Sequence, residues 1–148
     1  MLTEPLRRLF FFMAFRSKTY TDETLIKALS DATLPPLDFT HKNHIRLVWA
    51  IHRRSPQDTF KQASYLIRNY AFNIGESHIY HETLTYAAVK IIVNCMNTSS
   101  AQSFEEFIES NNTLLVDFKS LISKHYSQET LDSKIAKTKV VLPDLAPF

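Results

Sequence analysis

The stretch Phe39–Trp49, which reads FTHKNHIRLVW, decides the fold that the sequence predicts. Thr40 is a good N-cap and an apolar stripe at helical spacing follows it, so the pattern predicts an amphipathic helix over about residues 41–54. His41 and His44 stand three residues apart at its start. Residues at this spacing are neighbours on one helix face, with Cβ atoms roughly 5–6 Å apart. Both imidazoles can therefore reach one ion, one water molecule or one substrate.

The remainder of the chain follows the same helical pattern. Apolar residues recur at helical spacing, and a single glycine in 148 residues leaves little room for hairpins. The sequence therefore predicts an all-α fold, a single compact bundle of about six to seven helices with an extended C-terminal tail over residues 140–148. The other helices are expected over about residues 21–32, 55–74, 81–96, 114–124 and 127–137, with a short one that begins at Ser103.

The first residues of the chain are predicted to be a separate segment. Residues 1–20 are assigned to an apolar arm, and residues 21–148 to a single helical domain. The apolar run Leu9–Phe15 follows two arginines like a signal peptide, but it is short and lacks a cleavage site after it. It is also too short to span a bilayer, so no transmembrane segment is expected. An arm that packs on the domain, on a second copy or on a partner is the favoured interpretation, and a start of translation at Met13 is the alternative.

Composition and charge narrow the classes of protein. Lys and Arg together number 17 against 15 for Asp and Glu, and they are scattered, so the sequence gives no evidence for a nucleic-acid partner. Eleven Phe and six Tyr supply ample material for a core. Any metal would thus serve function and would not be needed for folding. The only cysteine, Cys95, can form no intrachain disulfide, which favours a reducing, cytoplasmic location.

A second group of polar residues stands at the start of the helix expected from residue 81. The stretch Tyr80–Thr85, which reads YHETLT, combines His81 and Glu82 next to a helix N-terminus. His81 lies at the N-terminal end of that helix's apolar stripe. The sequence therefore predicts a site where the starts of the two helices meet.

These two stretches carry a resemblance. The pattern F-x-H-x-x-H-x-R-x-x-W at Phe39–Trp49, together with Y-H-E-T-x-T at Tyr80–Thr85, resembles an uncharacterised family of small bacterial helical proteins. The end of the chain, from Tyr126 to Pro147, is similar too, so the likeness covers roughly residues 24–147. The resemblance implies that these polar residues form one constellation, and it implies no reaction.

The sharpest hypothesis for this constellation is a mononuclear metal site. His41, His44 and His81 are the candidate ligands, and a divalent transition metal such as Zn, Fe or Mn is the candidate cofactor. Because consecutive helical residues diverge by about 100°, His81 and Glu82 are not expected to bind one ion together. Glu82 would then orient an imidazole or act as general base to a bound water, with His81 as the other candidate catalytic residue.

Each of these residues also has a structural interpretation. His41 can join the cap at the helix start, and His44 can be a core histidine that is hydrogen-bonded to Tyr80 or Glu82. Arg46 is a candidate for binding an anionic ligand or cofactor, and a structural ion pair with a carboxylate is its alternative.

Two function classes follow, and the sequence leaves open whether the protein is an enzyme. In the first, a His/Glu site carries out metal-dependent or acid–base chemistry on a small molecule. In the second, the chain is a non-catalytic protein-interaction module, and the His/Glu cluster is a buried polar network. An enzyme needs a concave opening onto the histidines, whereas a structural network should be closed and fully hydrogen-bonded.

Overall fold

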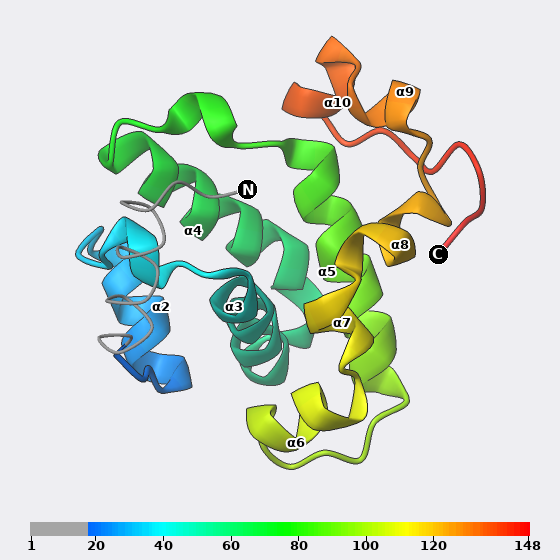
Figure 1. The fold of residues 1–148 in the computed structure, drawn as a ribbon. Coiled ribbons are helices and arrows are strands. Elements are labelled where there is room, and N and C mark those ends of the chain that lie inside the picture. Colours follow the sequence, from blue (N-terminus) through cyan, green and yellow to red (C-terminus); the bar gives the residue numbers. More distant parts are fainter. Residues whose placement is uncertain (1–17) are drawn as a thin grey trace, which may run out of the picture.

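The computed structural model describes residues 18–148, so residues 1–17 of the predicted arm, with the apolar run Leu9–Phe15, lie outside the described residues. In this part of the chain all regular elements are helical, which confirms the all-α prediction (Figure 1). None of these helices has both the length and the apolar character needed to cross a bilayer. The nine α-helices of the described residues are α2 (Asp22–Ser30), α3 (His41–Arg54), α4 (Thr59–Asn73), α5 (Glu82–Asn97), α6 (Phe104–Ser110), α7 (Thr113–Val116), α8 (Phe118–Ser123), α9 (Gln128–Leu131) and α10 (Lys134–Thr138). Three short 3-10 helices join them: η1 (Pro36–Asp38), η2 (Pro56–Asp58) and η3 (Ser77–Ile79).

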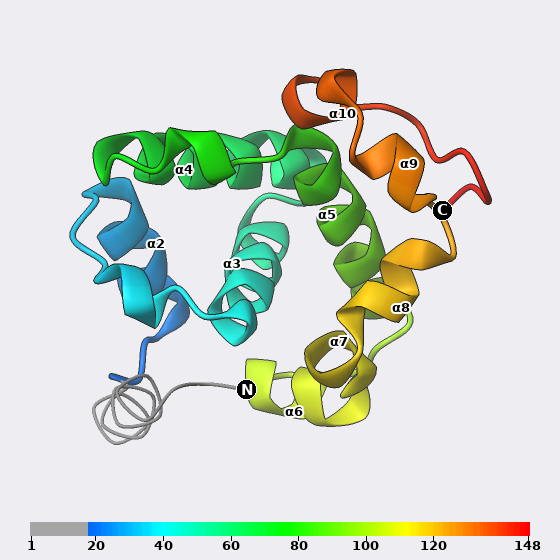
Figure 2. The ribbon, with the colours of Figure 1, turned by 45° about the horizontal axis from the view of Figure 1, so that its top comes forward.

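Helix α3 occupies the centre of this arrangement. It contacts α2, α4, α5 and α7, and Figure 2 shows it between α2 on one side and α5 on the other, with α4 running across their ends. Its central residues are buried because helices surround it: Ile45, Leu47, Val48, Trp49, Ala50 and Ile51. Helices α8 and α10 pack on α5, so the C-terminal part of the chain covers the outer side of that helix. The predicted helix of residues 41–54 is therefore the core helix of the fold.

Most of the predicted N-cap residues cap helices in the structure. The side chain of Thr21 accepts a hydrogen bond from the backbone N–H of Thr24, and that of Thr40 accepts one from Asn43. The predicted helix start at Ser55 is wrong, because that side chain makes no capping bond and the next three residues form η2. Helix α4 begins only at Thr59. It ends before Gly75, whose φ of +76° lies in the left-handed region that glycine adopts without strain.

The described residues contain nine α-helices, more than the predicted six to seven, because the C-terminal half is divided into more and shorter helices. The helix expected over residues 114–124 is split into α7 and α8 at Asp117, whose φ of −150° and ψ of 49° are not helical. The helix expected over residues 127–137 is split as well. Ser127 caps α9 and Ser133 caps α10, so a second capping serine ends one helix and starts the next.

The last ten residues contain no helix and are tied to the domain by hydrogen bonds. The hydroxyl of the buried Thr83 donates to the carbonyl of Lys139 at 2.6 Å and accepts from the backbone N–H of Val141 at 3.0 Å. The hydroxyl of Tyr126 donates to the carbonyl of Val141 at 2.6 Å, and burial raises the pKa of this phenol to about 12. Asp144 accepts from the hydroxyl of Ser127 at 2.6 Å. These bonds fix the segment against α5 and against the connection between α8 and α9.

Candidate functional site

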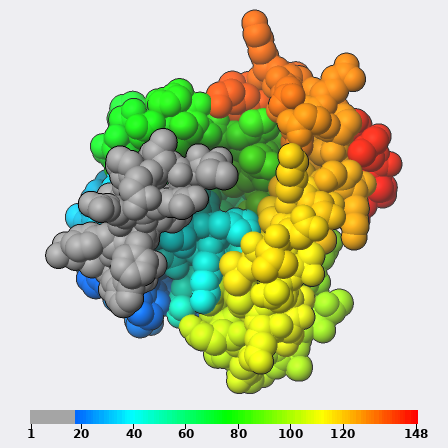
Figure 3. Space-filling view, in the orientation of Figure 1, coloured from blue at the N-terminus to red at the C-terminus, as the bar shows by residue number. Residues whose placement is uncertain are grey.

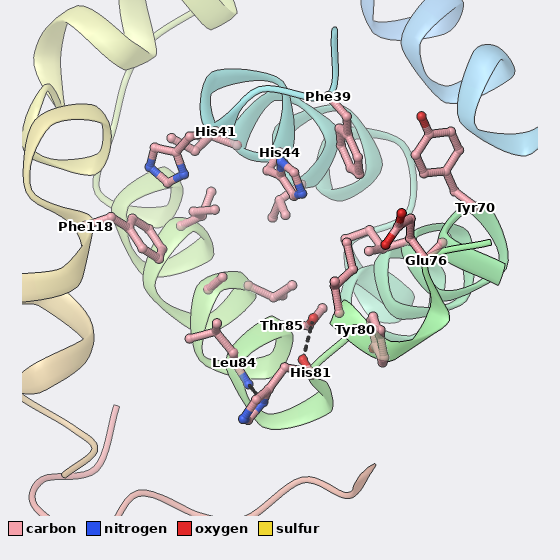
Figure 4. A pocket seen from close by; sticks show the side chains of 18 of the residues that line it. Phe39, His41, His44, Tyr70, Glu76, Tyr80, His81, Leu84, Thr85 and Phe118 are labelled. Atoms are coloured by element: carbon pink, nitrogen blue, oxygen red, sulfur yellow. Dashed lines mark hydrogen bonds between the residues drawn. The ribbon is translucent and has the colours of Figure 1, made fainter. Parts of the chain in front are cut away.

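A cavity of about 650 Å³ lies between α3, α4, the start of α5 and α8. Figure 3 shows the surface hollowed between the residues of α3, α5 and the α7–α8 segment, and Figure 4 shows the side chains that line the hollow. Of the 21 residues that line it within residues 18–148, 16 have aliphatic or aromatic side chains. The other five are His41, His44, Glu76, His81 and Thr85. The cavity is thus mainly apolar, with a few polar groups in its wall. Its volume lies in the range that is typical of small-molecule binding sites.

The start of α3 fixes the ring of His44 from two sides. Nδ1 of His44 lies 2.8 Å from the carbonyl oxygen of Thr40, the N-cap one turn earlier. The ring of Phe39 stacks on the imidazole at a centroid distance of 3.6 Å and an interplanar angle of 9°. Phe39 precedes the cap and His44 is the fourth helical residue, which are the positions of a hydrophobic staple. The imidazole therefore has one defined orientation at the cavity wall.

The hydrogen bond to Thr40 also fixes the tautomer of His44. A carbonyl oxygen only accepts, so Nδ1 carries the proton and Nε2 of the neutral ring keeps its lone pair. Nε2 has no hydrogen-bond partner among residues 18–148. Burial lowers the pKa of His44, and the nearby His41 lowers it further, while the bond to Thr40 acts in the opposite direction. The ring is therefore neutral near pH 7 and offers an acceptor.

His41 lies beside His44 but is held differently. Its Nε2–H donates to the carbonyl oxygen of Leu114 in α7 at 2.7 Å. Its ring meets that of Phe118 edge-on at a centroid distance of 5.1 Å. Since Nε2 carries the proton, Nδ1 of the neutral ring keeps a lone pair, and no residue of the described chain donates to it. His41 thus joins α3 to the α7–α8 segment and contributes one further acceptor near the cavity.

His81 is the N-cap of α5, and both of its ring nitrogens are engaged. Nδ1 accepts from the backbone N–H of Leu84 at 3.0 Å, and Nε2–H donates to the carbonyl of Leu131 at 2.8 Å. Figure 4 shows the ring on the opposite wall of the cavity from His44. Its described hydrogen bonds use the ring's one donor and one acceptor, so His81 joins the start of α5 to α9.

Glu82 also makes a local contact and does not line the cavity. Its Oε2 accepts from the hydroxyl of Tyr80 at 2.7 Å, so the carboxylate holds the phenol in place. Burial raises the pKa of Tyr80 above its usual value, and the bond to Glu82 raises it further. Tyr80 therefore remains protonated throughout the physiological pH range.

Arg46 points away from the cavity toward α2 and α6. Its Nε–H donates to Asp22 at 2.8 Å and its Nη1–H donates to Glu105 at 3.2 Å. The guanidinium also lies over the ring of Phe104, 5.0 Å from the centroid. These contacts match the structural ion pair that the sequence allowed, and the carboxylates belong to α2 and α6.

The predicted site residues are thus only partly brought together. His41, His44 and His81 line one cavity, but within residues 18–148 no group of three or more His, Cys, Asp or Glu side chains is placed to hold a metal ion. The geometry therefore gives no support to the predicted metal ligand set. Sequence reasoning assigned no site role to Tyr70, Glu76 or Phe118, because they reach the cavity from other helices and no local motif marks them.

Comparisons of the chain with protein-family models, with curated proteins and with solved structures find no match. The resemblance of the two motifs to a small bacterial family therefore stays a prediction. The geometry of the cavity is the remaining basis for an inference about function.

The lowered pKa of His44 predicts a pH dependence of stability. Below its ordinary pKa of 6.5 the unfolded chain binds this proton first, so the folded state loses stability until the pH reaches the lower folded pKa. We expect the free energy of unfolding to fall between about pH 7 and pH 5 more steeply for the wild type than for His44→Phe. Burial lowers the pKa of His52 as well, so part of the slope should persist in the variant. Urea titrations at several pH values measure this difference, and identical slopes for both proteins would contradict it.

Proposed function

We propose that this protein binds a small, largely apolar molecule in the cavity and carries out acid–base chemistry on it, with Nε2 of His44 as the base. One observation carries the proposal: the lone pair of a fixed, neutral imidazole belongs to the wall of an apolar cavity of ligand size. No buried side-chain nitrogen or oxygen of residues 18–148 lacks a partner, so Nε2 is open to the cavity, where a ligand that donates a hydrogen bond can reach it. The metal-dependent form of the hypothesis has no comparable observation in its favour.

The surroundings of His44 suit proton transfer. When Nε2 accepts a proton, the positive charge spreads over the ring, and the carbonyl oxygen of Thr40 already faces the Nδ1–H. Phe39 holds the ring plane, so little reorganisation is needed at the moment of transfer. His44 is thus the proposed base. The sequence indicates His81 and Glu82 as the catalytic candidates. In this account His81 is part of the cavity wall, and Glu82 positions Tyr80, which also lines the cavity.

A specific observation also favours the second function class, a protein-interaction module with a structural polar network. The side chains of His81, Glu82 and Arg46 are hydrogen-bonded to other residues of the chain, as a structural network requires. His44 departs from this pattern because its Nε2 has no partner in the described residues. The two classes are therefore distinguished by whether the cavity binds a small molecule.

Filling the cavity provides the test. Ala88 on α5 lines it, so Ala88→Phe would place a ring in the space that a ligand needs. We expect the wild type to bind 2-methoxynaphthalene, an uncharged apolar probe, with shift changes at the starts of α3 and α5 in amide NMR spectra. We expect the affinity of Ala88→Phe to be lower by about tenfold or more, since loss of about 1.4 kcal/mol of binding free energy suffices for that.

The control places the same ring outside the cavity. Lys90→Phe adds a phenylalanine at an exposed position of α5 and should bind the probe as the wild type does. Circular dichroism verifies that both variants keep their helices. Absence of binding by the wild type, or equal binding by Ala88→Phe, would contradict the proposal and favour the interaction module.

A further inference from the structure

The three hydroxyl groups that the described part of the chain places at the cavity wall have no free protons to donate to a ligand. The hydroxyl of Thr85 donates to the carbonyl of His81 at 2.8 Å, and that of Tyr80 donates to Glu82 at 2.7 Å. The hydroxyl of Tyr70 donates to the carbonyl of Leu34 at 2.6 Å. Each of these three protons is therefore already used within the protein.

The imidazoles of the wall offer only hydrogen-bond acceptors, because their N–H groups already donate within the protein. The one N–H of neutral His44 donates to Thr40, and the one N–H of His41 in its neutral form donates to Leu114. Nε2 of His44 and Nδ1 of His41 are left as lone-pair atoms without a donor in the described chain. The side chains that residues 18–148 contribute to the wall therefore accept hydrogen bonds from a ligand but do not donate them.

The charged residues near the cavity disfavour an anionic ligand. Among residues 18–148, no lysine or arginine lines it, and its single acidic side chain is Glu76, which is exposed at the edge. An anionic ligand would lose its hydration without gaining a cation and would face this carboxylate. The carboxylate of Glu76 lies 3.3 Å from Nε2 of His78, so it already has a partner of its own.

The shape of the wall favours a flat ligand. The rings of Phe39, Tyr70, Tyr80 and Phe118 line the cavity, and Figure 4 shows them on several sides of the same space. Aromatic rings pack on one another in stacked or edge-on geometry with a gain beyond that of buried area alone. A volume of about 650 Å³ accommodates a molecule of two fused rings.

From these observations we infer that the ligand class is an uncharged aromatic molecule with one hydroxyl or N–H group, which donates a hydrogen bond to Nε2 of His44. This inference rests on the proposed function and names the chemistry of its ligand. A phenol or a fused-ring alcohol fits this description, whereas a carboxylate or a phosphate does not. The same donor is the group whose proton His44 would accept in acid–base chemistry.

Four probes with the same two rings and different polar groups test the inference: 2-naphthol, 2-methoxynaphthalene, 2-naphthoate and 2-naphthylmethylammonium. We expect 2-naphthol to bind wild-type protein about tenfold more tightly than its methyl ether, which lacks the donor, because one hydrogen bond contributes about 1–1.5 kcal/mol. We expect 2-naphthoate to bind most weakly. In His44→Phe the advantage of 2-naphthol over the ether should disappear.

A spectroscopic measurement on the wild type makes the test independent of whether the variant folds. Long-range ¹H–¹⁵N spectra should show His44 with Nδ1 protonated and Nε2 bare, and 2-naphthol should shift the Nε2 resonance while the methyl ether leaves it in place. Tightest binding by 2-naphthoate or by the ammonium probe, or equal binding by 2-naphthol and its ether, would overturn the ligand class. The cavity proposal would then survive, since a bound probe lost in Ala88→Phe still supports it. Failure of all four probes to bind would overturn both.

Discussion

Replacement of Phe107 by alanine is expected to lower the free energy of unfolding by about 3–5 kcal/mol. Phe107 is fully buried in α6, and its ring lies 4.9 Å from that of Trp49 in the central helix α3. Helix α6 has only seven residues, so side-chain packing and not its own backbone bonds must hold it in place. The substitution removes the ring at the centre of that contact. Urea unfolding of the two proteins measures the difference.

The control is a phenylalanine that makes little contact. Phe72 in α4 is 72% exposed, and Phe72→Ala should change the free energy of unfolding by less than about 0.5 kcal/mol. Phe107 does not line the cavity, so folded Phe107→Ala protein should bind 2-methoxynaphthalene as the wild type does. A loss of stability below about 1 kcal/mol would show that α6 is not anchored through this ring.

The parts of the fold that depend on local chemistry could be predicted from the sequence. Thr40 caps α3 and the apolar stripe after it is buried, because a capping hydroxyl and its helix are neighbours in the chain. The same holds for Thr21 and α2. The breaks at Asp117 and Ser133 were missed, since an apolar pattern that runs through a break looks like one longer helix.

The candidate site could be predicted only in part, because its polar contacts join distant segments. His41 bonds to a carbonyl 73 residues later, and His81 to one 50 residues later. Every residue has a backbone carbonyl, so no sequence motif indicates which carbonyl a histidine will bind. The sequence could therefore indicate that these histidines have a role, but it could not indicate that His81 has both nitrogens engaged while His44 keeps one available.

One local signal in the sequence also bears on the orientation of His44. Phe39 and His44 stand at the two positions of a hydrophobic staple around the cap Thr40, which predicts contact between their side chains. In the structure Nδ1 of His44 faces the carbonyl oxygen of Thr40, so Nε2 lies on the other side of the ring. The pattern F-T-x-x-x-H therefore carries more structural information than the spacing of the two histidines.

Replacement of Thr83 by valine is expected to lower the free energy of unfolding by about 1–3 kcal/mol, because it leaves two backbone groups without a partner. The side chain of Thr83 is fully buried, and its hydroxyl is bonded to both the carbonyl of Lys139 and the N–H of Val141. Valine has nearly the same shape, so the packing of α5 should persist while the C-terminal segment is released. Amide exchange at Val141 should therefore increase more than exchange in α5.

A second threonine on the same helix separates the loss of these bonds from the loss of any hydroxyl. Thr85 donates to the carbonyl of His81, which also accepts the backbone N–H of Thr85 at 3.0 Å. Thr85→Val therefore leaves no group unpaired and should cost less than about 1 kcal/mol. Equal losses in both variants would mean that the two bonds of Thr83 do not hold the C-terminal segment. A larger loss in Thr83→Val, with faster exchange confined to residues 139–148, would show that the hydroxyl of one buried threonine joins that segment to the helix that carries the cavity wall.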